Sequence, residues 1–224
     1  MSELKDYFGL RKNIYRLLGK AFHKEADNAY LDEMEKYMAV FKEIAGTYDN
    51  ADLAKGVEIY AAFREASKGK DVTEELAREF ALIFLSTGTT QGIKSVIPHE
   101  SVYLSPQGLT MQEQRDEVLE IYYNQGVGRS DNFKEPEDHI SAEMGFMAYM
   151  SEKTAELIDD EGNGADENLQ IQRDFLAVHL LKWAPKACDD VYNMGSDYYK
   201  AMALVTKGYL VTDKQFLDAI FEED

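Results

Sequence analysis

Residues 136–158, PEDHISAEMGFMAYMSEKTAELI, carry the pattern that decides the fold class. The apolar positions that fit a helical repeat along this stretch are Ile140, Met144, Met147, Ala148, Ala155 and Ile158. Their spacing places them on one face of an α-helix, and a proline such as Pro136 suits a first helical turn. The sequence therefore predicts a helix from about residue 136 to 158 that buries one face.

The same spacing recurs through most of the chain of 224 residues. Only four prolines interrupt it, and no long stretch alternates polar and apolar residues as a half-buried strand would. Further helices are expected at about residues 10–21, 28–45, 52–67, 73–85, 111–125, 169–183, 185–208 and 213–221. The predicted fold is all-α, a single globular helical bundle of about eight or nine helices that forms one domain over residues 1–224.

Two stretches lack helical spacing. Residues from about 86 to 110 are rich in glycine, proline and threonine, yet they include apolar side chains such as Val102 and Leu104, which favours a long packed loop over a disordered one. Residues 159–168 contain five acids and two glycines and are expected to form an exposed connector. That connector is also where we expect a hinge.

The charge of the chain limits its partners. Its 42 acidic residues exceed its 24 lysines and arginines, so the formal net charge is −18. Such a chain repels phosphate backbones and anionic membrane surfaces, which argues against nucleic acid as a ligand. Most of the excess lies in residues 101–224. A basic partner would meet this half, although a solvated acidic face without any partner explains the same composition.

Other features favour a cytoplasmic protein. Cys188 is the only cysteine, which excludes an intrachain disulfide and a thiolate metal cluster. The longest apolar run, over residues 80–85, has six residues, far below the roughly 20 that a membrane-spanning helix needs. The first 20 residues carry scattered charges and no apolar core, so no secretory signal is expected there.

Motifs for cofactor chemistry are missing from the sequence. No Glu-x-x-His pair, phosphate-binding loop, dinucleotide fingerprint or hydrolase nucleophile motif occurs, so we expect no metal and no cofactor. One stretch still attracts attention: Glu135-Pro136-Glu137-Asp138-His139, followed by Glu143. Acids at a helix start complement the helix dipole, which is a purely structural explanation. His139 and Glu143 are instead expected beside the apolar stripe, at the edge of the core, where they could face a ligand.

This stretch resembles the Glu-Pro-x-Asp-His signature of the TorD/DmsD/NarJ-like chaperones, the redox enzyme maturation proteins of molybdenum oxidoreductases. Four further stretches resemble the family in the same order along the chain: Arg11-x3-Tyr15-x-Leu17-Leu18, Glu79-Phe80-x2-Ile83-Phe84, Pro98-His99-Glu100-Ser101-Val102-Tyr103-Leu104 and Phe175-x3-His179-Leu180-x2-Trp183-x-Pro185. The resemblance therefore spans about residues 11–185.

The resemblance implies an all-helical cytoplasmic chaperone without catalytic activity. Such a chaperone binds the twin-arginine leader or the body of a molybdoenzyme apoprotein, and it holds the client until the molybdopterin cofactor is inserted before export. By analogy, the peptide site would comprise Glu135, Pro136, Asp138, His139, Glu143, Glu100, Tyr103, Phe80 and Phe84. Asp138 and Glu143 would meet the arginines, and the aromatic side chains would meet the apolar segment. The family includes monomers and domain-swapped homodimers, and the sequence leaves both states open.

Two other classes of function remain open on the sequence. A helical-bundle enzyme would use His139 and Glu143 as a base or a metal site. An acidic helical adaptor would bind a basic partner through many dispersed carboxylates. The first predicts a bound metal or a turnover, and the second predicts binding that no single substitution abolishes.

Overall fold

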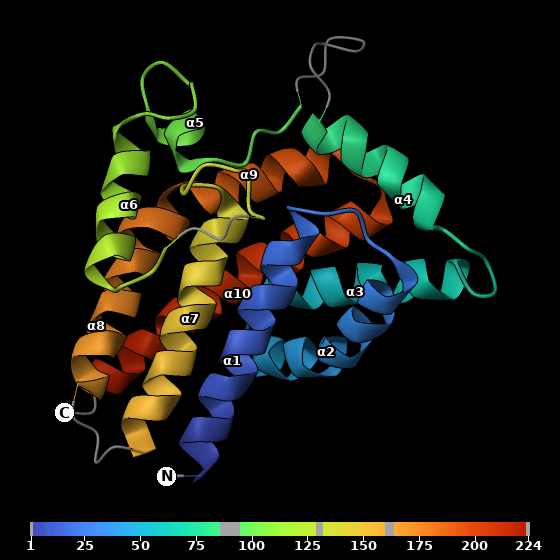
Figure 1. The fold of residues 1–224 in the computed structure, drawn as a ribbon. Helices are drawn as coiled ribbons and strands as arrows, with labels where there is room; N and C mark the ends of the chain where they lie inside the picture. The colour runs from blue at the N-terminus through green and yellow to red at the C-terminus, as the bar shows by residue number, and fades with distance from the viewer. Residues whose placement is uncertain (1, 86–94, 129–131, 160–163, 223–224) are drawn as a thin grey trace. The chain divides into compact units, whose positions relative to one another are not determined.

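The structure is a computed structural model that describes residues 2–85, 95–128, 132–159 and 164–222. These residues form helices without any strand, which confirms the predicted all-α class (Figure 1). The helices are α1 (Ser2–Ala21), α2 (Asn28–Thr47), α3 (Ala51–Ala66), α4 (Thr73–Phe80), α5 (Glu100–Leu104), α6 (Glu113–Asn124), α7 (Ile140–Asp159), α8 (Ala165–Phe175), α9 (Leu181–Met194) and α10 (Asp197–Glu222). Two π-helical segments, η1 (Ala81–Leu85) and η2 (Leu176–Leu180), continue α4 and join α8 to α9.

Close contacts divide the chain into two compact units. Unit 1 comprises Met1–Lys20, His99–Trp183 and Phe216–Asp224, and unit 2 comprises Ala21–Pro98 and Ala184–Gln215. The boundaries fall near the end of α1, before α5, and inside α9 and α10. The organisation as one domain with a hinge remains a prediction. Residues 160–163 of the expected hinge lie outside the described residues, and the helix that follows begins at Ala165.

In unit 1, α1 lies alongside α7 (Figure 1). The guanidinium of Arg11, only 1% exposed, donates a hydrogen bond of 2.6 Å to Ser151 Oγ on α7 and another to Gln172 on α8. Aromatic rings join α6, α7 and α8, since the ring of Phe146 lies 4.8 Å from Tyr122 and 4.7 Å from Phe175 between centroids. The buried guanidinium of Arg11 and the ring contacts of Phe146 therefore hold α7 in place.

In unit 2, α3 crosses α10 at close range. A Cβ atom added to Gly56 would lie 2.8 Å from a methyl group of Val205, and one added to Gly208 would lie 2.7 Å from the backbone nitrogen of Leu53. Asn50 connects the two helices at this crossing, because its side chain accepts a hydrogen bond from Leu53 N–H at 2.9 Å and donates one to the Gly208 carbonyl at 3.2 Å. The two glycines therefore allow backbone-to-backbone packing.

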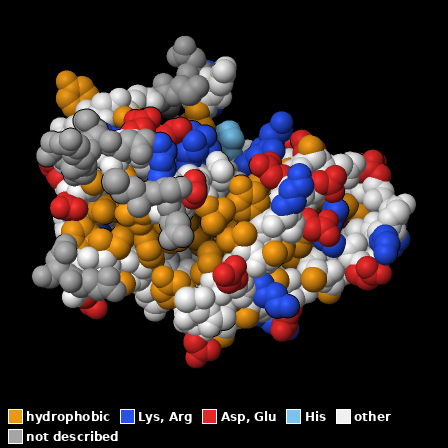
Figure 2. All heavy atoms as spheres, turned by 90° about the horizontal axis from the view of Figure 1, so that it is seen from below, with side chains coloured by type: hydrophobic (Ala, Val, Ile, Leu, Met, Phe, Trp, Pro, Cys, Tyr) orange, Lys and Arg blue, Asp and Glu red, His pale blue; other side chains and the backbone are white. Residues whose placement is uncertain are grey.

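Surface acids in both units lie among bases. On the face that Figure 2 shows, red carboxylates and blue lysine and arginine side chains are neighbours. In unit 1, Glu152 pairs with Lys12 at 2.8 Å and with Arg16 at 3.2 Å. In unit 2, Lys207 pairs with Asp189 at 2.8 Å and with Asp52 at 3.3 Å. Part of the acidic excess is therefore neutralised locally.

Several predicted helix boundaries are wrong. The break expected before Pro185 is absent, and α9 continues to Met194 although the proline ring removes one backbone donor. Burial explains the continuity, since Ala184, Ala187 and Cys188 are at most 1% exposed and packing outweighs the lost bond. The real break lies at Gly195, where a Cβ would come within 2.5 Å of Tyr199 Cβ.

Two further corrections concern the predicted loop and the start of the helix that was expected at residue 136. The predicted loop over residues 86–110 contains the short helix α5, and its residues 86–94 lie outside the described part of the chain. The helix predicted from residue 136 begins four residues later, at Ile140. Both differences reflect contacts between the two segments, because Asp138 accepts hydrogen bonds from the backbone N–H groups of Glu100 and Ser101, which begin α5, and residues 136–139 therefore precede α7.

Candidate functional site

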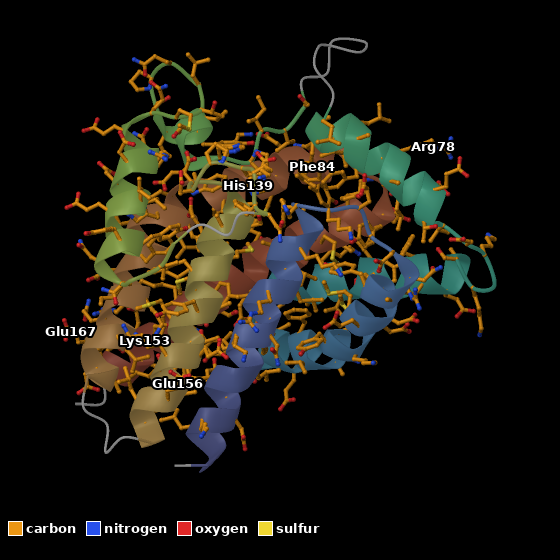
Figure 3. All side chains as sticks on the ribbon, viewed as in Figure 1. Arg78, Phe84, His139, Lys153, Glu156 and Glu167 are labelled. Carbon is orange, nitrogen blue, oxygen red and sulfur yellow. The ribbon has the colours of Figure 1, made fainter. Side chains whose placement is uncertain are left out.

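Two segments that are far apart in the sequence meet in unit 1. The backbone N–H of Glu100 donates to the Asp138 carbonyl at 2.9 Å, and His99 and His139 form an isolated antiparallel bridge. Their rings pack edge to face with centroids 4.9 Å apart. The Pro98–Leu104 motif and the Glu135–Glu143 motif therefore build one site, at the N-terminal end of α7, where Figure 3 labels His139.

Asp138 holds these segments together. Its carboxylate accepts a hydrogen bond from the Ser101 backbone N–H at 2.9 Å and another from the Ser101 hydroxyl. Ser101 is the second residue of α5, so the carboxylate caps that short helix, where a negative charge is also favoured by the helix dipole. His139 begins α7 in a similar way, since its Nδ1 accepts from Ser141 N–H at 3.1 Å. Capping thus explains why α7 starts after His139.

Three carboxyl groups lie together in the interior. Glu100, Asp138 and Glu143 are each at most 1% exposed, and we call them the buried acid cluster. His179 Nδ1 lies within hydrogen-bonding distance of Glu100, 3.1 and 3.0 Å from its two carboxyl oxygens. Trp183 Nε1–H donates to Glu143 Oε2 at 3.3 Å. The η2–α9 segment therefore supplies polar partners for Glu100 and Glu143, whereas α5 supplies those of Asp138.

Burial controls the protonation of this cluster. It raises the pKa of Glu143 well above the usual range of a carboxyl group, and the nearby charges of Glu100 and Asp138 raise it further. Burial also raises the pKa of Glu100, against the opposing effect of His179. The pKa of His99 is lowered by burial, although the carboxylates of Asp138 and Glu135 oppose that shift. Glu143 thus keeps its proton to a higher pH than an exposed glutamate.

Two oxygen atoms of the cluster, Asp138 Oδ1 and Glu143 Oε1, are buried without a hydrogen-bonding partner among the described residues. Such atoms are rare in folded proteins because desolvation costs free energy. The expectation that Glu143 lies at the edge of the core is wrong, since its side chain is fully buried. A peptide arginine therefore cannot contact Glu143 from solvent in this conformation.

The remaining predicted site residues differ in exposure. The Glu135 side chain is 42% exposed and carries a carboxylate oxygen 3.5 Å from His99 Nε2. Pro136 and Tyr103 are half-buried, and the Tyr103 ring packs against Trp183 with centroids 5.6 Å apart. Glu135, Pro136, Asp138, His139, Glu143, Glu100 and Tyr103 all belong to unit 1. Seven of the nine predicted residues therefore share one compact unit.

Phe80 and Phe84 belong to unit 2. Their rings pack together at 4.9 Å, and Phe84 also contacts Phe22 and Tyr199, at 6.0 and 6.1 Å between centroids. Phe80 is 4% exposed. Within unit 2 these rings form part of an aromatic core, and a role for them in peptide binding remains a prediction.

Sequence reasoning missed several residues of the site. His179 was expected to be a packed core histidine, but it bonds to Glu100. His99 and Ser101 were not predicted as site residues, although both lie in the Pro98–Leu104 motif. The motif would have been sufficient to find them, because it places three consecutive polar residues, His99, Glu100 and Ser101, in a segment that lacks helical spacing.

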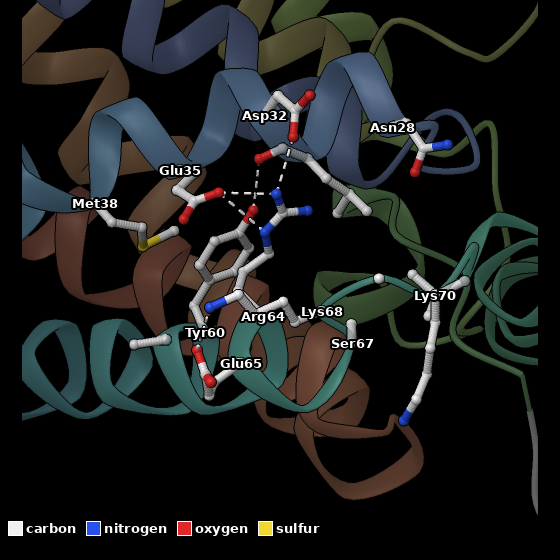
Figure 4. Close-up of a pocket in the computed structure, with 14 residues that line it drawn as sticks. Asn28, Asp32, Glu35, Met38, Tyr60, Arg64, Glu65, Ser67, Lys68 and Lys70 are labelled. Atoms are coloured by element: carbon white, nitrogen blue, oxygen red, sulfur yellow. Dashed lines mark hydrogen bonds and ion pairs between the residues drawn. The ribbon is translucent and has the colours of Figure 1, made fainter.

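Apart from this site, a pocket of about 600 Å³ lies between α2 and α3 in unit 2 (Figure 4). Arg64 crosses it and pairs with Asp32 at 2.9 Å and with Glu35 at 2.8 Å. Tyr60 OH donates to the Leu31 carbonyl at 2.8 Å. None of the predicted site residues lines this pocket, and its central charges are paired with each other. It is therefore not the candidate site.

The fold and the site define a class: an all-α protein whose central polar cluster is held by hydrogen bonds within the chain. Among the described residues no group of three or more histidine, cysteine or acidic side chains is arranged to hold a metal ion. None of the described helices is both long and apolar enough to cross a membrane.

The chain belongs to the nitrate reductase delta subunit family, whose pattern matches residues 49–189. It is also similar along its whole length to proteins named Chaperone protein TorD. The Vibrio cholerae protein is 28% identical over 229 residues, covering 100% of this chain and 99% of the relative. The Vibrio parahaemolyticus protein is 27% identical over 97% of this chain and 99% of its own length, and the Photobacterium profundum protein is 25% identical over 97% and 98%. These matches confirm the predicted family and a chaperone rather than an enzyme.

Proposed function

We propose that this protein is a cytoplasmic chaperone of a molybdenum oxidoreductase. It binds the twin-arginine leader or the body of the apoenzyme and holds it until the molybdopterin cofactor has been inserted. The similarity to TorD chaperones over the whole chain carries this proposal. The excess of acidic residues supports it, because a leader begins with a basic segment.

The leader contacts Glu135, Pro136 and Tyr103 directly in this proposal. Glu135 offers an exposed carboxylate, and a guanidinium pairs with a carboxylate through two charge-assisted hydrogen bonds. Tyr103 offers a half-buried ring for an apolar side chain. His139 and the buried acid cluster act by holding the two segments in register, since their side chains are at most 4% exposed. Phe84, which is half-buried, is a further proposed contact of the apolar segment, and Phe80, which is 4% exposed, supports its ring.

Calorimetric titration with a synthetic twin-arginine leader tests the proposal. A peptide with two lysines in place of the arginines serves as the ligand control, because lysine cannot form the bidentate pair. We expect Glu135→Gln to weaken binding of the arginine leader about tenfold, which is about 1.4 kcal/mol and close to the lower end of the range of about 1.5–3 kcal/mol for a hydrogen bond to a charged group.

Glu156→Gln is the matched control variant. Glu156 is exposed and lies on α7, about 24 Å along the helix axis from Ile140 at 1.5 Å per residue (Figure 3). We expect its affinity to equal that of the unmodified chain. Equal losses for Glu135→Gln and Glu156→Gln would favour the acidic adaptor over a defined peptide site.

Failure of the unmodified chain to bind any leader would contradict leader recognition. Co-purification with the tagged apoenzyme then tests whether the chaperone binds the body of its client. Light scattering of the complex over a range of concentrations distinguishes a monomeric chaperone from a domain-swapped homodimer.

A further inference from the structure

A separate apolar pocket of about 320 Å³ lies between α6 and α7 in unit 1. Two helices form most of its walls. Helix α6 and the residues after it contribute Leu119, Tyr122, Val127 and Gly128, and α7 and the residues before it contribute Phe133, Glu137, Ser141, Ala142, Gly145 and Phe146. Most of these side chains are apolar. The lining includes no member of the buried acid cluster.

Gly145 has no role in the fold that its surroundings reveal. A Cβ atom added there would meet nothing within 4 Å, and the residue does not have a positive φ. A glycine inside a helix costs about 0.5–1 kcal/mol relative to alanine. It is exposed although its neighbours Met144 and Phe146 are buried. The missing side chain leaves the α7 wall of the pocket open to an approaching chain.

Acidic side chains lie on α6, the helix that forms one wall of the pocket. Among the 12 residues of α6, Glu113, Asp116, Glu117 and Glu120 are acidic and exposed, and Arg115 is the one base. The charge of Arg115 is already paired, since its Nε–H donates a hydrogen bond to Glu137 at 2.6 Å and its NH1 donates one to Asp116 at 2.9 Å. Asp116, which pairs with Arg115, precedes Leu119 by three residues and lies on the same face of α6. Glu113, Glu117 and Glu120 add to the negative charge of the helix. A negative helix therefore borders an apolar pocket.

We infer that the α6–α7 pocket receives an apolar side chain of a client segment that also carries positive charge. This inference rests on the proposed function, because a twin-arginine leader joins a basic segment to an apolar one. The apolar lining selects the side chain, and the carboxylates of α6 attract the neighbouring basic residues. The pocket thus supplies specificity for the apolar segment, whereas Glu135 meets the arginines.

Substitutions at Gly145 test the inference with little risk to the fold. Gly145→Phe places a ring at the open wall of the pocket, and Gly145→Ala adds only a methyl group at the same position. The probe is a synthetic peptide with a twin-arginine pair followed by an apolar segment of alanine and leucine. We expect Gly145→Phe to weaken its binding about tenfold or more and Gly145→Ala to change it less than about twofold, as expected when one well-packed apolar anchor is excluded.

A second peptide, with alanine in place of every leucine, completes a double-mutant cycle. We expect Gly145→Phe to have no effect on this weaker ligand, because no large apolar side chain is then displaced. Circular dichroism confirms that both variants fold, and Gly145→Leu replaces Gly145→Phe if the ring prevents folding. Equal binding of the leucine peptide by the phenylalanine and alanine variants would overturn the inference while leaving the proposed function intact. Absence of binding by the unmodified chain would overturn both.

Discussion

Glu143 is a carboxylic acid that protein surrounds completely, and its oxygen Oε2 accepts a hydrogen bond from Trp183. Because burial raises its pKa in the folded state, the unfolded chain releases this proton at a lower pH. Its contribution to stability is therefore fully present below the unfolded pKa of about 4.3 and is lost as the pH rises toward the folded value.

We expect Glu143→Gln to remove this pH dependence. Glutamine has the shape of the protonated acid and still accepts from the Trp183 indole, so the variant remains folded. Between pH 5 and 7, the unfolding free energy of the unmodified chain should fall relative to that of the variant by up to about 1.4 kcal/mol per pH unit. Urea unfolding at several pH values measures this difference, with Glu156→Gln as control. Parallel curves for the unmodified chain and Glu143→Gln would show that Glu143 is ionised when folded.

Helices α1, α7 and α8 meet at the Arg11 guanidinium. It bonds to Ser151 and Gln172 and lies over the Tyr15 ring, 5.2 Å from its centroid. We expect Arg11→Lys to lower the unfolding free energy by about 1–3 kcal/mol, because the lysine side chain is shorter, so its ammonium does not reach the position of the NH1 nitrogen that donates both bonds, and it lacks the planar group that stacks on Tyr15. Arg16→Lys is the matched control, since Arg16 is 57% exposed and pairs only at the surface, and we expect it to cost less than about 0.5 kcal/mol. Similar losses in urea unfolding would refute a central role for Arg11.

The crossing of α3 and α10 depends on a glycine. A methyl group on Gly208 would lie 2.7 Å from the backbone nitrogen of Leu53, which cannot move without disturbing α3. We expect Gly208→Ala to destabilise the protein by about 1–3 kcal/mol, the usual cost of overpacking. Gly46→Ala on α2 is the control, because nothing lies within 4 Å of the added carbon and alanine favours the helix. Thermal unfolding should therefore shift in opposite directions for the two variants.

Helix content could be predicted from the sequence because the spacing of apolar residues is local. The start of α7 could not, since the carbonyl of Asp138 bonds to Glu100, 38 residues earlier in the chain. The burial of Glu143 was missed for the same reason: its partner Trp183 lies 40 residues later. Motif resemblance succeeded where spacing failed, because it brought together the Pro98–Leu104 and Glu135–Glu143 segments without knowledge of their contacts.

At the scale of the whole molecule, the net charge of −18 acts on any basic ligand at long range. The proposed leader complex should therefore form faster and more tightly at low ionic strength, because the screening length falls from about 30 Å at 0.01 M salt to about 10 Å at 0.1 M. We expect the affinity for a synthetic twin-arginine leader to fall about tenfold between 0.02 and 0.3 M sodium chloride, mostly through a slower association rate. A peptide with glutamine in place of its basic residues should bind weakly and show little dependence on salt. Stopped-flow fluorescence separates the rates, and a salt-independent association rate for the basic peptide would mean that short-range contacts alone recruit the client.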